Sequence, residues 1–280
     1  MNEAVKHSKS GINQRHEKLL DALKERGTLS ISELADSFKC SLATIRRDVQ
    51  ELESQGYLRR FHGAVALQDM ITERAFHEKS MTNRVEKEAI ANVVAQWIPD
   101  HTVVGLNGGT TTTTIAEKLV ELKRSVTVVT NAVNIAFLLS DGGLPVVVIG
   151  GELRPQNYET TGSVALGSLS DLHLDWALLG ANGVDHHFGV TTTTEQEAAV
   201  GRMFAERADN VLLAVDSTKV GHTALFRMLS WNMVNIIATD GGASKLLRAW
   251  GISPMVEVDN ATGLWKVPAG GLSISGPTLL

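Results

Sequence analysis

The chain has 280 residues, of which 43% are hydrophobic and 20% are charged, so it can bury a substantial core and is not globally disordered. Its length predicts about two domains. The net charge of −5 is unevenly distributed: residues 1–66 hold eleven Lys and Arg against nine Asp and Glu, and the rest holds fifteen against twenty-two. A basic N-terminal segment is compatible with nucleic-acid binding even though the rest of the chain is acidic.

Two classes of protein are disfavoured by composition. Cys40 is the only cysteine, so the chain forms no intramolecular disulfide and no cysteine-based zinc site. The first residues are polar, unlike a signal peptide, and the longest apolar runs, such as 144–149, fall far short of the ~20 residues that span a bilayer. We therefore expect a soluble, cytoplasmic protein.

The first 67 residues have the pattern of a small DNA-binding fold. Residues 1–12 have no period and predict a flexible tail. Helical spacing predicts helices over 13–26, over 31–38 with Ser30 as the cap, and from Ser41 to Gly56. Residues 57–67 predict a short β-ribbon. Three helices followed by a ribbon indicate a winged helix-turn-helix domain over 13–67.

The third predicted helix has an inward and an outward face. We expect Leu42, Ile45, Val49 and Leu52 to be packed inward. The outward face and the ribbon then offer side chains for base edges and phosphates: Ser41, Ala43, Thr44, Arg46, Arg47, Gln50, Arg59, Arg60 and His62. The alternative is a solvated helix face on which Asp48 and Glu51 pair with the arginines. The complete helix-turn-helix pattern favours DNA.

The pattern changes after a polar linker at 68–82. Strand-like runs lie at 102–106, 126–130, 145–149, 176–179, 211–215 and 234–239. Helical segments at 112–122, 131–139, 195–208 and 243–250 separate several of them. This alternation indicates an α/β domain over 83–259 with a mostly parallel sheet. Residues 260–280 are rich in Gly, Ser and Pro and predict a second flexible tail.

Several predicted strands end in glycine or polar residues. Ligands of open α/β sheets bind at the carboxyl ends of strands, and the amides at a helix N-terminus bind phosphate. The candidate ligand-binding residues at these ends are Asn107, Gly108, Gly109, Thr110, Thr111, Thr112, Thr130, Asn131, Gly150, Gly151, Gly180, Asn182, Asp216 and Lys219. Lys219 could neutralise a phosphate, and Asp216 could accept sugar hydroxyls or simply cap the following turn.

These motifs resemble those of DeoR-type transcriptional regulators. The resemblance covers roughly residues 13–258 and is carried by Ser41-x-x-Thr-Ile-Arg-Arg-Asp-Val, Arg60-Phe-His-Gly-Ala, Glu86-Lys87, Gly108-Gly-Thr-Thr-Thr, Gly180-Ala-Asn-Gly and Asp216-Ser-Thr-Lys. It implies an oligomeric regulator, most often a repressor of carbohydrate-metabolism genes. It also implies a C-terminal domain that resembles sugar-phosphate isomerases and binds a phosphorylated sugar or related metabolite as effector, without a cofactor.

The chain departs from this family pattern at two places. Only Gly63 follows His62, where the family usually has two glycines. Asn107-Gly108-Gly109 stands where many members have Asp-Ala-Gly, so an amide replaces a carboxylate that could hold a sugar hydroxyl. The identity of the effector is therefore left open.

An enzyme with an attached DNA-binding head is the alternative function. Aldose–ketose isomerisation needs a carboxylate base. The pentose-phosphate isomerases that the domain resembles have acidic residues after the Gly-Ala of the fourth strand, whereas Asn182-Gly183-Val184 follows Ala181 here. Asp185 and Glu195 remain as stand-ins. No carboxylate–histidine group has ligand spacing along the sequence, and adjacent His186 and His187 rarely converge on one ion, so we expect no metal site.

Overall fold

The computed structural model describes residues 15–23, 26–54, 57–61, 64–67, 79–257 and 262–272. The predicted tail at 1–12, the linker up to residue 78 and the ribbon tip His62-Gly63 lie outside these residues. Contacts divide the chain into two compact units, Met1–Glu78 and Lys79–Leu280. Each unit is described by itself.

The N-terminal unit has the elements of a winged helix-turn-helix. A first helix over 15–23 is followed by α2 (Ile31–Phe38) and α3 (Leu42–Ser54). Ser30 caps α2 as predicted: its side chain accepts from the Glu33 backbone N–H, and the Glu33 side chain accepts from the Ser30 backbone N–H. The ribbon consists of β2 (Leu58–Phe61) and β3 (Ala64–Leu67), and β1 (Leu29–Ser30) adds a third antiparallel strand.

The buried stripe of α3 differs from the predicted one. Ile45, Val49 and Leu52 are buried as expected, but Leu42 is 47% exposed. Leu42 is the first residue of α3, and the face that packs on the core begins one turn later, at Ile45. The fourth buried position of the helix is instead charged: Asp48 is 4% exposed.

Asp48 is buried because the first helix supplies its partners. Arg15 donates to both carboxylate oxygens, from Nε at 2.5 Å and from Nη2 at 2.7 Å. His16 Nε2 lies 3.4 Å from the same carboxylate. The Asp48 carboxylate also raises the pKa of Arg15 through this hydrogen bond. A bidentate ion pair therefore joins the first helix to α3.

The C-terminal unit is built on an eight-stranded sheet. All six predicted strands form: β4 (Val103–Leu106), β5 (Thr127–Thr130), β6 (Val146–Val148), β9 (Leu174–Leu179), β12 (Ala208–Ala214) and β14 (Ile236–Thr239). They are mutually parallel, in the order β14-β12-β9-β4-β5-β6. The predicted α/β class with a mostly parallel sheet is confirmed.

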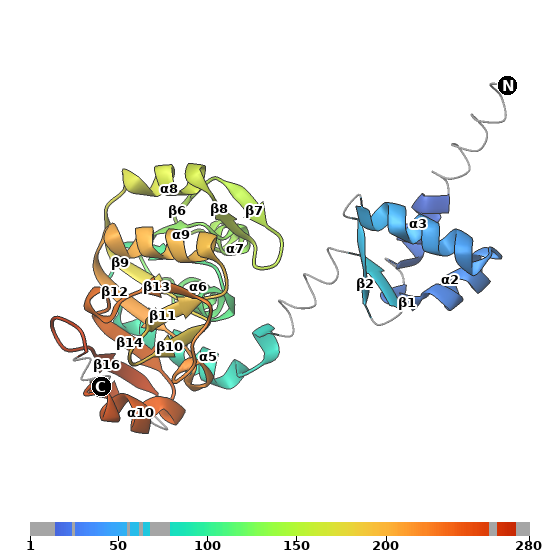
Figure 1. Ribbon diagram of the computed structural model, residues 1–280. Coiled ribbons are helices and arrows are strands. Elements are labelled where there is room, and N and C mark those ends of the chain that lie inside the picture. The colour runs from blue at the N-terminus through green and yellow to red at the C-terminus, as the bar shows by residue number, and fades with distance from the viewer. Residues whose placement is uncertain are drawn as a thin grey trace. The chain divides into compact units, whose positions relative to one another are not determined.

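Helices cover both faces of this sheet (Figure 1). One face packs against α5 (Arg84–Trp97), α6 (Thr110–Glu121) and α7 (Val133–Asp141). The other packs against α8 (Ser163–Ser170), α9 (Glu195–Glu206) and α10 (Ser244–Ala249). Neighbouring residues of β12 therefore face different cores, Leu212 one and Leu213 the other, as expected for a parallel sheet buried on both sides. No helix in the described ranges is long and apolar enough to cross a bilayer.

Short antiparallel elements that the sequence pattern did not predict surround the sheet. They are the hairpin β7 (Glu152–Arg154) and β8 (Glu159–Thr161), and a three-stranded sheet of β10 (Gly183–Asp185), β11 (Gly189–Thr192) and β13 (Phe226–Leu229). Three 3-10 turns follow strands: η1 (Ser217–Lys219), η2 (Trp231–Met233) and η3 (Gly241–Ala243). Strands of three or four residues are too short to show a hydrophobic period.

The prediction of a flexible tail from residue 260 is wrong for the residues that the structure describes there. Residues 263–266 form β16, which pairs antiparallel with β14 on one side and with β15 (Ser253–Glu257) on the other. Leu264 and Trp265 have no exposed surface. Pairing with β14 buries this segment. The prediction failed because it rested on the composition of residues 260–280 as a whole, in which Gly, Ser and Pro outnumber the few residues of the strand.

Candidate nucleic-acid interface and ligand site

The outward face of α3 carries the side chains that the sequence predicts for DNA. Ala43, Arg46, Arg47 and Gln50 are exposed and Thr44 is half-buried. Ser41 accepts from the Thr44 backbone N–H at 3.1 Å and so caps the helix, which leaves its hydroxyl only partly available to another partner.

The side chains of Arg46 and Arg47 make no polar contact within the described part of the chain. Neither forms an ion pair or a hydrogen bond with a described residue. The alternative in which Asp48 pairs with these arginines is wrong, because the Asp48 carboxylate is buried against Arg15. Two adjacent guanidinium groups that no described side chain binds are therefore exposed on α3.

The two arginines of the ribbon differ. Arg59 is exposed and has no described ion-pair partner. Arg60 is held by Glu53 of α3: Arg60 Nη2 lies 2.6 Å from Glu53 Oε2, and the Arg60 backbone N–H donates to Oε1. This contact lowers the pKa of Glu53. Arg60 thus ties the ribbon to α3, and His62 lies outside the described residues.

In the C-terminal unit, three neighbouring strands bring their carboxyl ends together. Strand β9 lies between β4 and β12, so the ends of β4 and β12 are about 10 Å apart at ~4.8 Å per strand. Asn107, which follows β4, is bonded to Gly180, which follows β9. Asn107 Nδ2 donates to the Gly180 carbonyl at 3.1 Å, and its Oδ1 accepts from the Gly180 backbone N–H at 2.8 Å. The Asn107 amide is therefore engaged in joining two strands.

The loop after β4 leads into helix α6, whose first backbone amides have no intrahelical partner. Gly109 is the N-cap, with a φ of 135° that favours glycine. The hydroxyls of Thr112 and Thr113 both donate to the Gly109 carbonyl, and the Thr112 side chain is buried. The threonine hydroxyls thus hold the turn, while the N–H groups of Thr110, Thr111 and Thr112 precede the first intrahelical bond.

Other predicted ligand residues hold the framework. Thr130 accepts from the Ala132 backbone N–H, and Asn131 Nδ2 donates to the Thr160 carbonyl on β8. Gly151, with a φ of 142°, lets the hairpin come close: a Cβ there would lie 2.6 Å from the Thr161 carbonyl oxygen. Gly150 is exposed beside it, and Asn182 accepts from the Thr192 hydroxyl. These residues position the β7–β8 hairpin and the β9 loop at the site.

Asp216 acts as the cap that was one of its two predicted roles. It is 2% exposed, accepts from the Thr218 backbone N–H at 3.1 Å, and accepts from Asn83 Nδ2 at 3.0 Å. Asn83 comes directly before α5, so the start of that helix is fixed at the end of β12.

Lys219 is half-buried, and its side chain has no hydrogen-bond or ion-pair partner among the described residues. A second lysine, Lys87 of α5, lies near it and was missed as a site residue. Lys87 is 5% exposed and donates to the Lys79 and Thr82 carbonyls. Burial lowers the pKa of Lys87, the Asp216 carboxylate raises it, and the charge of Lys219 lowers it again. An ammonium group has three N–H donors, and these two carbonyls accept from two of them.

A carboxylate that the sequence pattern did not single out lies against the glycine turn. Glu159 of β8 is 4% exposed, and its Oε1 accepts from the Gly108 backbone N–H at 2.7 Å. Desolvation and the neighbouring Glu197 raise the pKa of Glu159 to about 7. Glu159 is 51 positions from Gly108, so no local sequence motif could have predicted their hydrogen bond.

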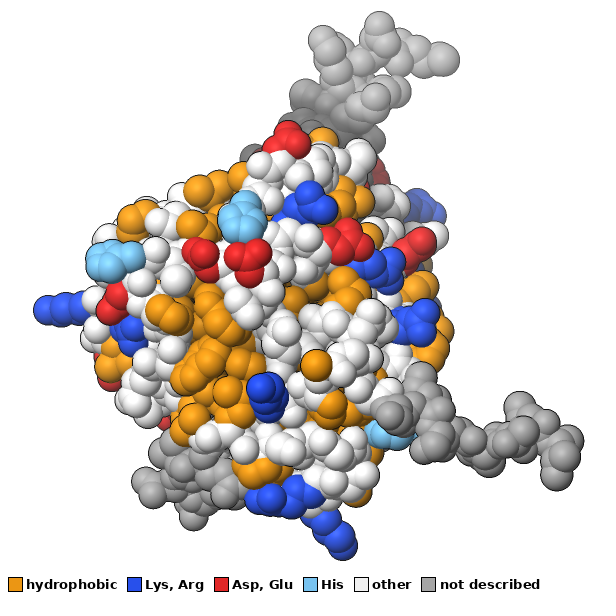
Figure 2. Space-filling model, turned by 90° about the vertical axis from the view of Figure 1, so that its left-hand side faces the viewer, with side chains coloured by type: hydrophobic (Ala, Val, Ile, Leu, Met, Phe, Trp, Pro, Cys, Tyr) orange, Lys and Arg blue, Asp and Glu red, His pale blue; other side chains and the backbone are white. Residues whose placement is uncertain are grey.

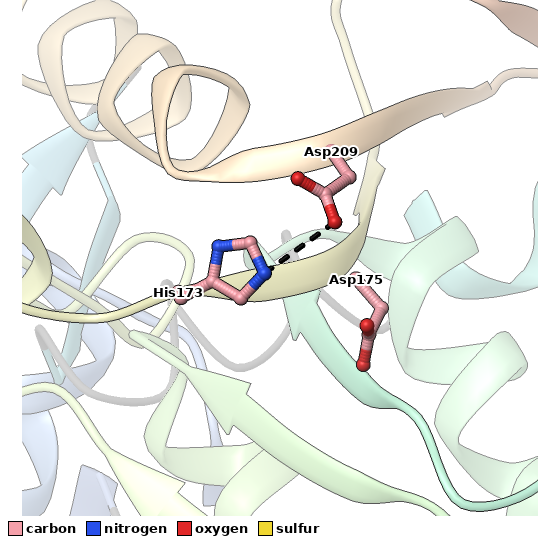
Figure 3. A group of neighbouring side chains, drawn as sticks. All are labelled: His173, Asp175 and Asp209. Atoms are coloured by element: carbon pink, nitrogen blue, oxygen red, sulfur yellow. Dashed lines mark ion pairs between the residues drawn. The ribbon is translucent and has the colours of Figure 1, made fainter.

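A second group of titratable side chains gathers at the opposite, amino-terminal ends of β9 and β12. His173 and Asp175 are two residues apart and so point to the same face of the sheet, and Asp209 of β12 lies beside them (Figure 3). Their ligand atoms lie within 4.8 Å of one another, so a carboxylate–histidine group forms in space from residues that the search for ligand spacing did not find. His173 pairs with Asp209 at 3.4 Å, and Asp175 accepts from the Val103 backbone N–H. Both members of the ion pair are exposed, and we assign no ion to the group.

Comparison with protein families matches both units. Residues 15–70 match the family description "DeoR-like helix-turn-helix domain". Residues 82–241 match the description "DeoR C terminal sensor domain".

Two proteins of similar sequence are named as repressors. The glycerol-3-phosphate regulon repressor of Escherichia coli K12 is 33% identical over 81% of this chain and 90% of its own length. The putative aga operon transcriptional repressor of Escherichia coli O157:H7 is 32% identical over 83% of this chain and 88% of its own. Among solved structures, ribose 5-phosphate isomerase A from Neisseria gonorrhoeae is 18% identical over 68% of this chain and 78% of its own, with a TM-score of 0.38.

Proposed function

The chain belongs to the DeoR family of transcriptional regulators, and on that premise we propose that its N-terminal unit binds operator DNA under the control of an effector held by its C-terminal unit. The protein is a DNA-binding regulator of the repressor type and not an enzyme, as its relatives are named. By analogy with the glycerol-3-phosphate regulon repressor, we assign it to carbohydrate-metabolism genes. We propose that it works in the cytoplasm, where a bacterial relative such as the Escherichia coli repressor meets the chromosome.

The DNA-binding proposal rests on the two exposed, adjacent arginines of α3. A helix in the major groove reads base edges with side chains of its outward face and contacts phosphates at its ends. The side chains of Arg46 and Arg47 are exposed there and form no ion pair with another residue in the part of the chain that the structure describes. Ser41, Ala43, Thr44 and Gln50 lie on the same helix, and Arg59, Arg60 and His62 of the ribbon extend the proposed surface.

Replacing either arginine should weaken operator binding without unfolding the protein. Loss of a bidentate base contact costs ~1–3 kcal/mol and relaxes selectivity at one base pair. Loss of a phosphate contact weakens binding to all sequences and reduces the salt slope by about one unit. Fluorescence anisotropy of Arg46→Ala and Arg47→Ala on an operator duplex over a salt series separates the two cases.

The matched control is Lys245→Ala, which removes one positive charge from an exposed site on α10. It should bind the operator as the wild type does. Normal binding by both arginine variants would contradict the proposed orientation of α3.

The effector proposal places an anionic group at the start of α6. The amides of Thr110, Thr111 and Thr112, which precede the first intrahelical bond, carry the positive end of the helix dipole. Lys219 and Lys87 are the cations near the end of β12, which β9 separates from β4. A phosphorylated sugar or related metabolite has the matching anionic group. Because the ligand is bound far along the chain from the head, it acts by binding two arrangements of the protein unequally.

The Lys219→Ala variant should bind the operator normally but lose its response to the effector. The substitution removes the proposed phosphate partner and leaves β12 intact. Allosteric coupling of this kind is typically ~1–3 kcal/mol, or roughly 5–150-fold in DNA affinity. Anisotropy titrations with phosphorylated sugars measure the response, with Lys245→Ala as the equal-charge control. Release from DNA at wild-type ligand concentrations would refute the role of Lys219.

We further propose that the protein works as a homo-oligomer, because one winged helix covers too few base pairs to select a genomic site. The edge strand β6 and helices α7 and α8 expose apolar side chains in the C-terminal unit: Phe137 is 76% exposed, Val148 49% and Val164 63%. Hydrophobic side chains also gather in a patch on the face drawn in Figure 2. Exposed apolar surface of this kind marks interfaces.

A charged side chain introduced among these exposed apolar residues should therefore dissociate the oligomer. Phe137→Glu should sediment as a smaller species and bind a two-half-site operator more weakly, because the two heads are no longer linked. Leu225→Glu, at an equally exposed position before β13, is the control and should leave both properties unchanged. An unaltered sedimentation coefficient for Phe137→Glu would exclude this edge as the interface.

A further inference from the structure

The segment at which the C-terminal unit continues from the linker is held by a buried lysine. The connection to the DNA-binding head enters this unit at Lys79, and residues 79–81 form a helical turn. Lys87 of α5 is 5% exposed, and its ammonium group donates to the Lys79 carbonyl at 2.5 Å and to the Thr82 carbonyl at 2.7 Å. One side chain thus fixes the backbone of residues 79–82.

A second side chain fastens the same segment to the end of β12. Asn83 Nδ2 donates to Asp216 Oδ1 at 3.0 Å and to Thr218 Oγ1 at 3.3 Å. Asn83 has a φ of 53°, in the left-handed region that asparagine tolerates better than most residues, and its carbonyl accepts from the Lys87 backbone N–H at 3.0 Å. The chain therefore turns at Asn83 into α5 while its side chain contacts β12.

These attachments lie beside the proposed effector site. Asp216 and Thr218 belong to the same turn as Lys219, the proposed phosphate partner. Lys219 is also close enough to Lys87 for its charge to lower the pKa of Lys87, although burial is the larger cause. An anion bound at Lys219 is therefore near the ammonium group that holds residues 79–82.

Five charged groups surround this place, the cations Lys87 and Lys219 and the anions Asp216, Asp240 and Glu86. Neutral N–H groups already donate to the carboxylates of Asp216 and Asp240. Neither lysine forms an ion pair within the described ranges, and Lys87 has only neutral carbonyls as hydrogen-bond acceptors. A hydrogen bond to an anion is roughly twice as strong as one to a neutral carbonyl, so a phosphate competes with these carbonyls for Lys87.

We propose that Lys87 and Asn83 couple the effector site to the DNA-binding head by fixing residues 79–83 in the ligand-free protein. This inference rests on the proposed function, since it names the regulation of the same site. In a homo-oligomer, a fixed point of attachment limits the positions open to each head and raises the effective concentration of the second head at its half-site. An anion at Lys219 draws Lys87 away from the Lys79 and Thr82 carbonyls, which frees the segment and weakens operator binding.

Anisotropy titrations of the full chain with two duplexes, one with a single half-site and one with both, test the role of the attachment without a ligand. Lys87→Met keeps the length of the buried side chain and removes its charge. Asn83→Gly removes the amide, and glycine accepts the φ of 53°. We expect both variants to bind the two-half-site duplex roughly fivefold more weakly or worse, the lower end of typical allosteric coupling. Their affinity for the single half-site should stay at the wild-type value.

The matched control is Arg84→Ala, which removes one positive charge next to Asn83 from an exposed pair with Glu88 and should bind both duplexes normally. Wild-type affinity of both test variants for the two-half-site duplex overturns the inference, and so does equal weakening on both duplexes, which indicates a damaged fold. If the wild type binds neither duplex, the proposed DNA-binding function fails and the inference fails with it.

Hydrogen exchange of the full chain tests the link to the effector site, with inorganic phosphate as the probe and chloride at equal ionic strength as the reference. In the wild type, phosphate should slow exchange in peptides of η1 and speed it over residues 79–83. In Lys87→Met, exchange over 79–83 should be fast with either salt. Protection of η1 without a change over 79–83 overturns the inference and leaves the effector site standing. If phosphate alters neither region, the proposed effector site fails and the inference fails with it.

Discussion

Replacing Trp265 with alanine should lower the free energy of unfolding of the C-terminal unit by ~3–5 kcal/mol, the usual loss for a fully buried aromatic side chain. Trp265 has no exposed surface, and its backbone lies between β14 and β15. Its ring also packs under the guanidinium group of Arg248, 5.0 Å from the ring centre. Chemical denaturation followed by tryptophan fluorescence measures the loss, since all five tryptophans lie between residues 97 and 265.

A milder substitution serves as the control. Trp265 Nε1 is buried without a hydrogen-bond partner in the structure, so Trp265→Phe removes an unsatisfied donor together with part of the ring and should cost much less than alanine. A chain ending at residue 259 should be destabilised still further, because the hydrogen-bonding edge of β14 loses its partner strand. If the shortened chain is as stable as the whole one, residues 263–266 are a dispensable tail and the assignment of β16 is wrong.

Replacing Asp48 with alanine should unfold the head at temperatures where the C-terminal unit stays folded. Removing one partner of a buried ion pair typically costs ~3–5 kcal/mol, and Arg15 is partly exposed, so we expect about 2–4 kcal/mol here. A domain of roughly 60 residues has little stability in reserve. The variant should therefore lose operator binding although it keeps Arg46 and Arg47.

Hydrogen exchange read by mass spectrometry distinguishes this local unfolding from a direct loss of DNA contacts. Peptides of α2 and α3 should lose protection in Asp48→Ala, while those of β9 and β12 should keep it. Glu51→Ala, an exposed carboxylate one turn further along α3, is the matched control and should leave protection and binding unchanged. Full protection of α3 in Asp48→Ala would show that the Arg15–Asp48 pair is not needed for the fold.

The elements that sequence alone predicted correctly are those defined by local chemistry. The capping box of Ser30 and Glu33 involves residues three apart, and the stripe Ile45, Val49 and Leu52 repeats at helical spacing. The six parallel strands are buried on both faces and therefore appear as continuous apolar runs. The resemblance to DeoR-type regulators depends on short motifs of the same local kind.

The use of the site's polar groups could not be predicted in this way. Asn107 was expected in the ligand site, with an amide where many family members have a carboxylate. Its amide instead joins β4 to β9, and the carboxylate at the turn is Glu159. Pairing of Asp48 with Arg46 and Arg47 was the less favoured alternative, and Asp48 is instead paired with Arg15, 33 residues away. Each of these outcomes depends on a partner from another element.

The sequence by itself determined the winged helix-turn-helix, the parallel α/β sheet, the exposed arginines and the family, because periodicity, caps and motifs act between residues close in the chain. Only the tertiary structure decided that residues 263–266 complete the sheet, and that Lys87, Lys219 and Glu159 gather at the carboxyl ends of β4, β9 and β12. Burial and charge compensation depend on which segments meet in space. A lysine or glutamate whose partner is tens of residues away looks, in the sequence, like any solvated charge.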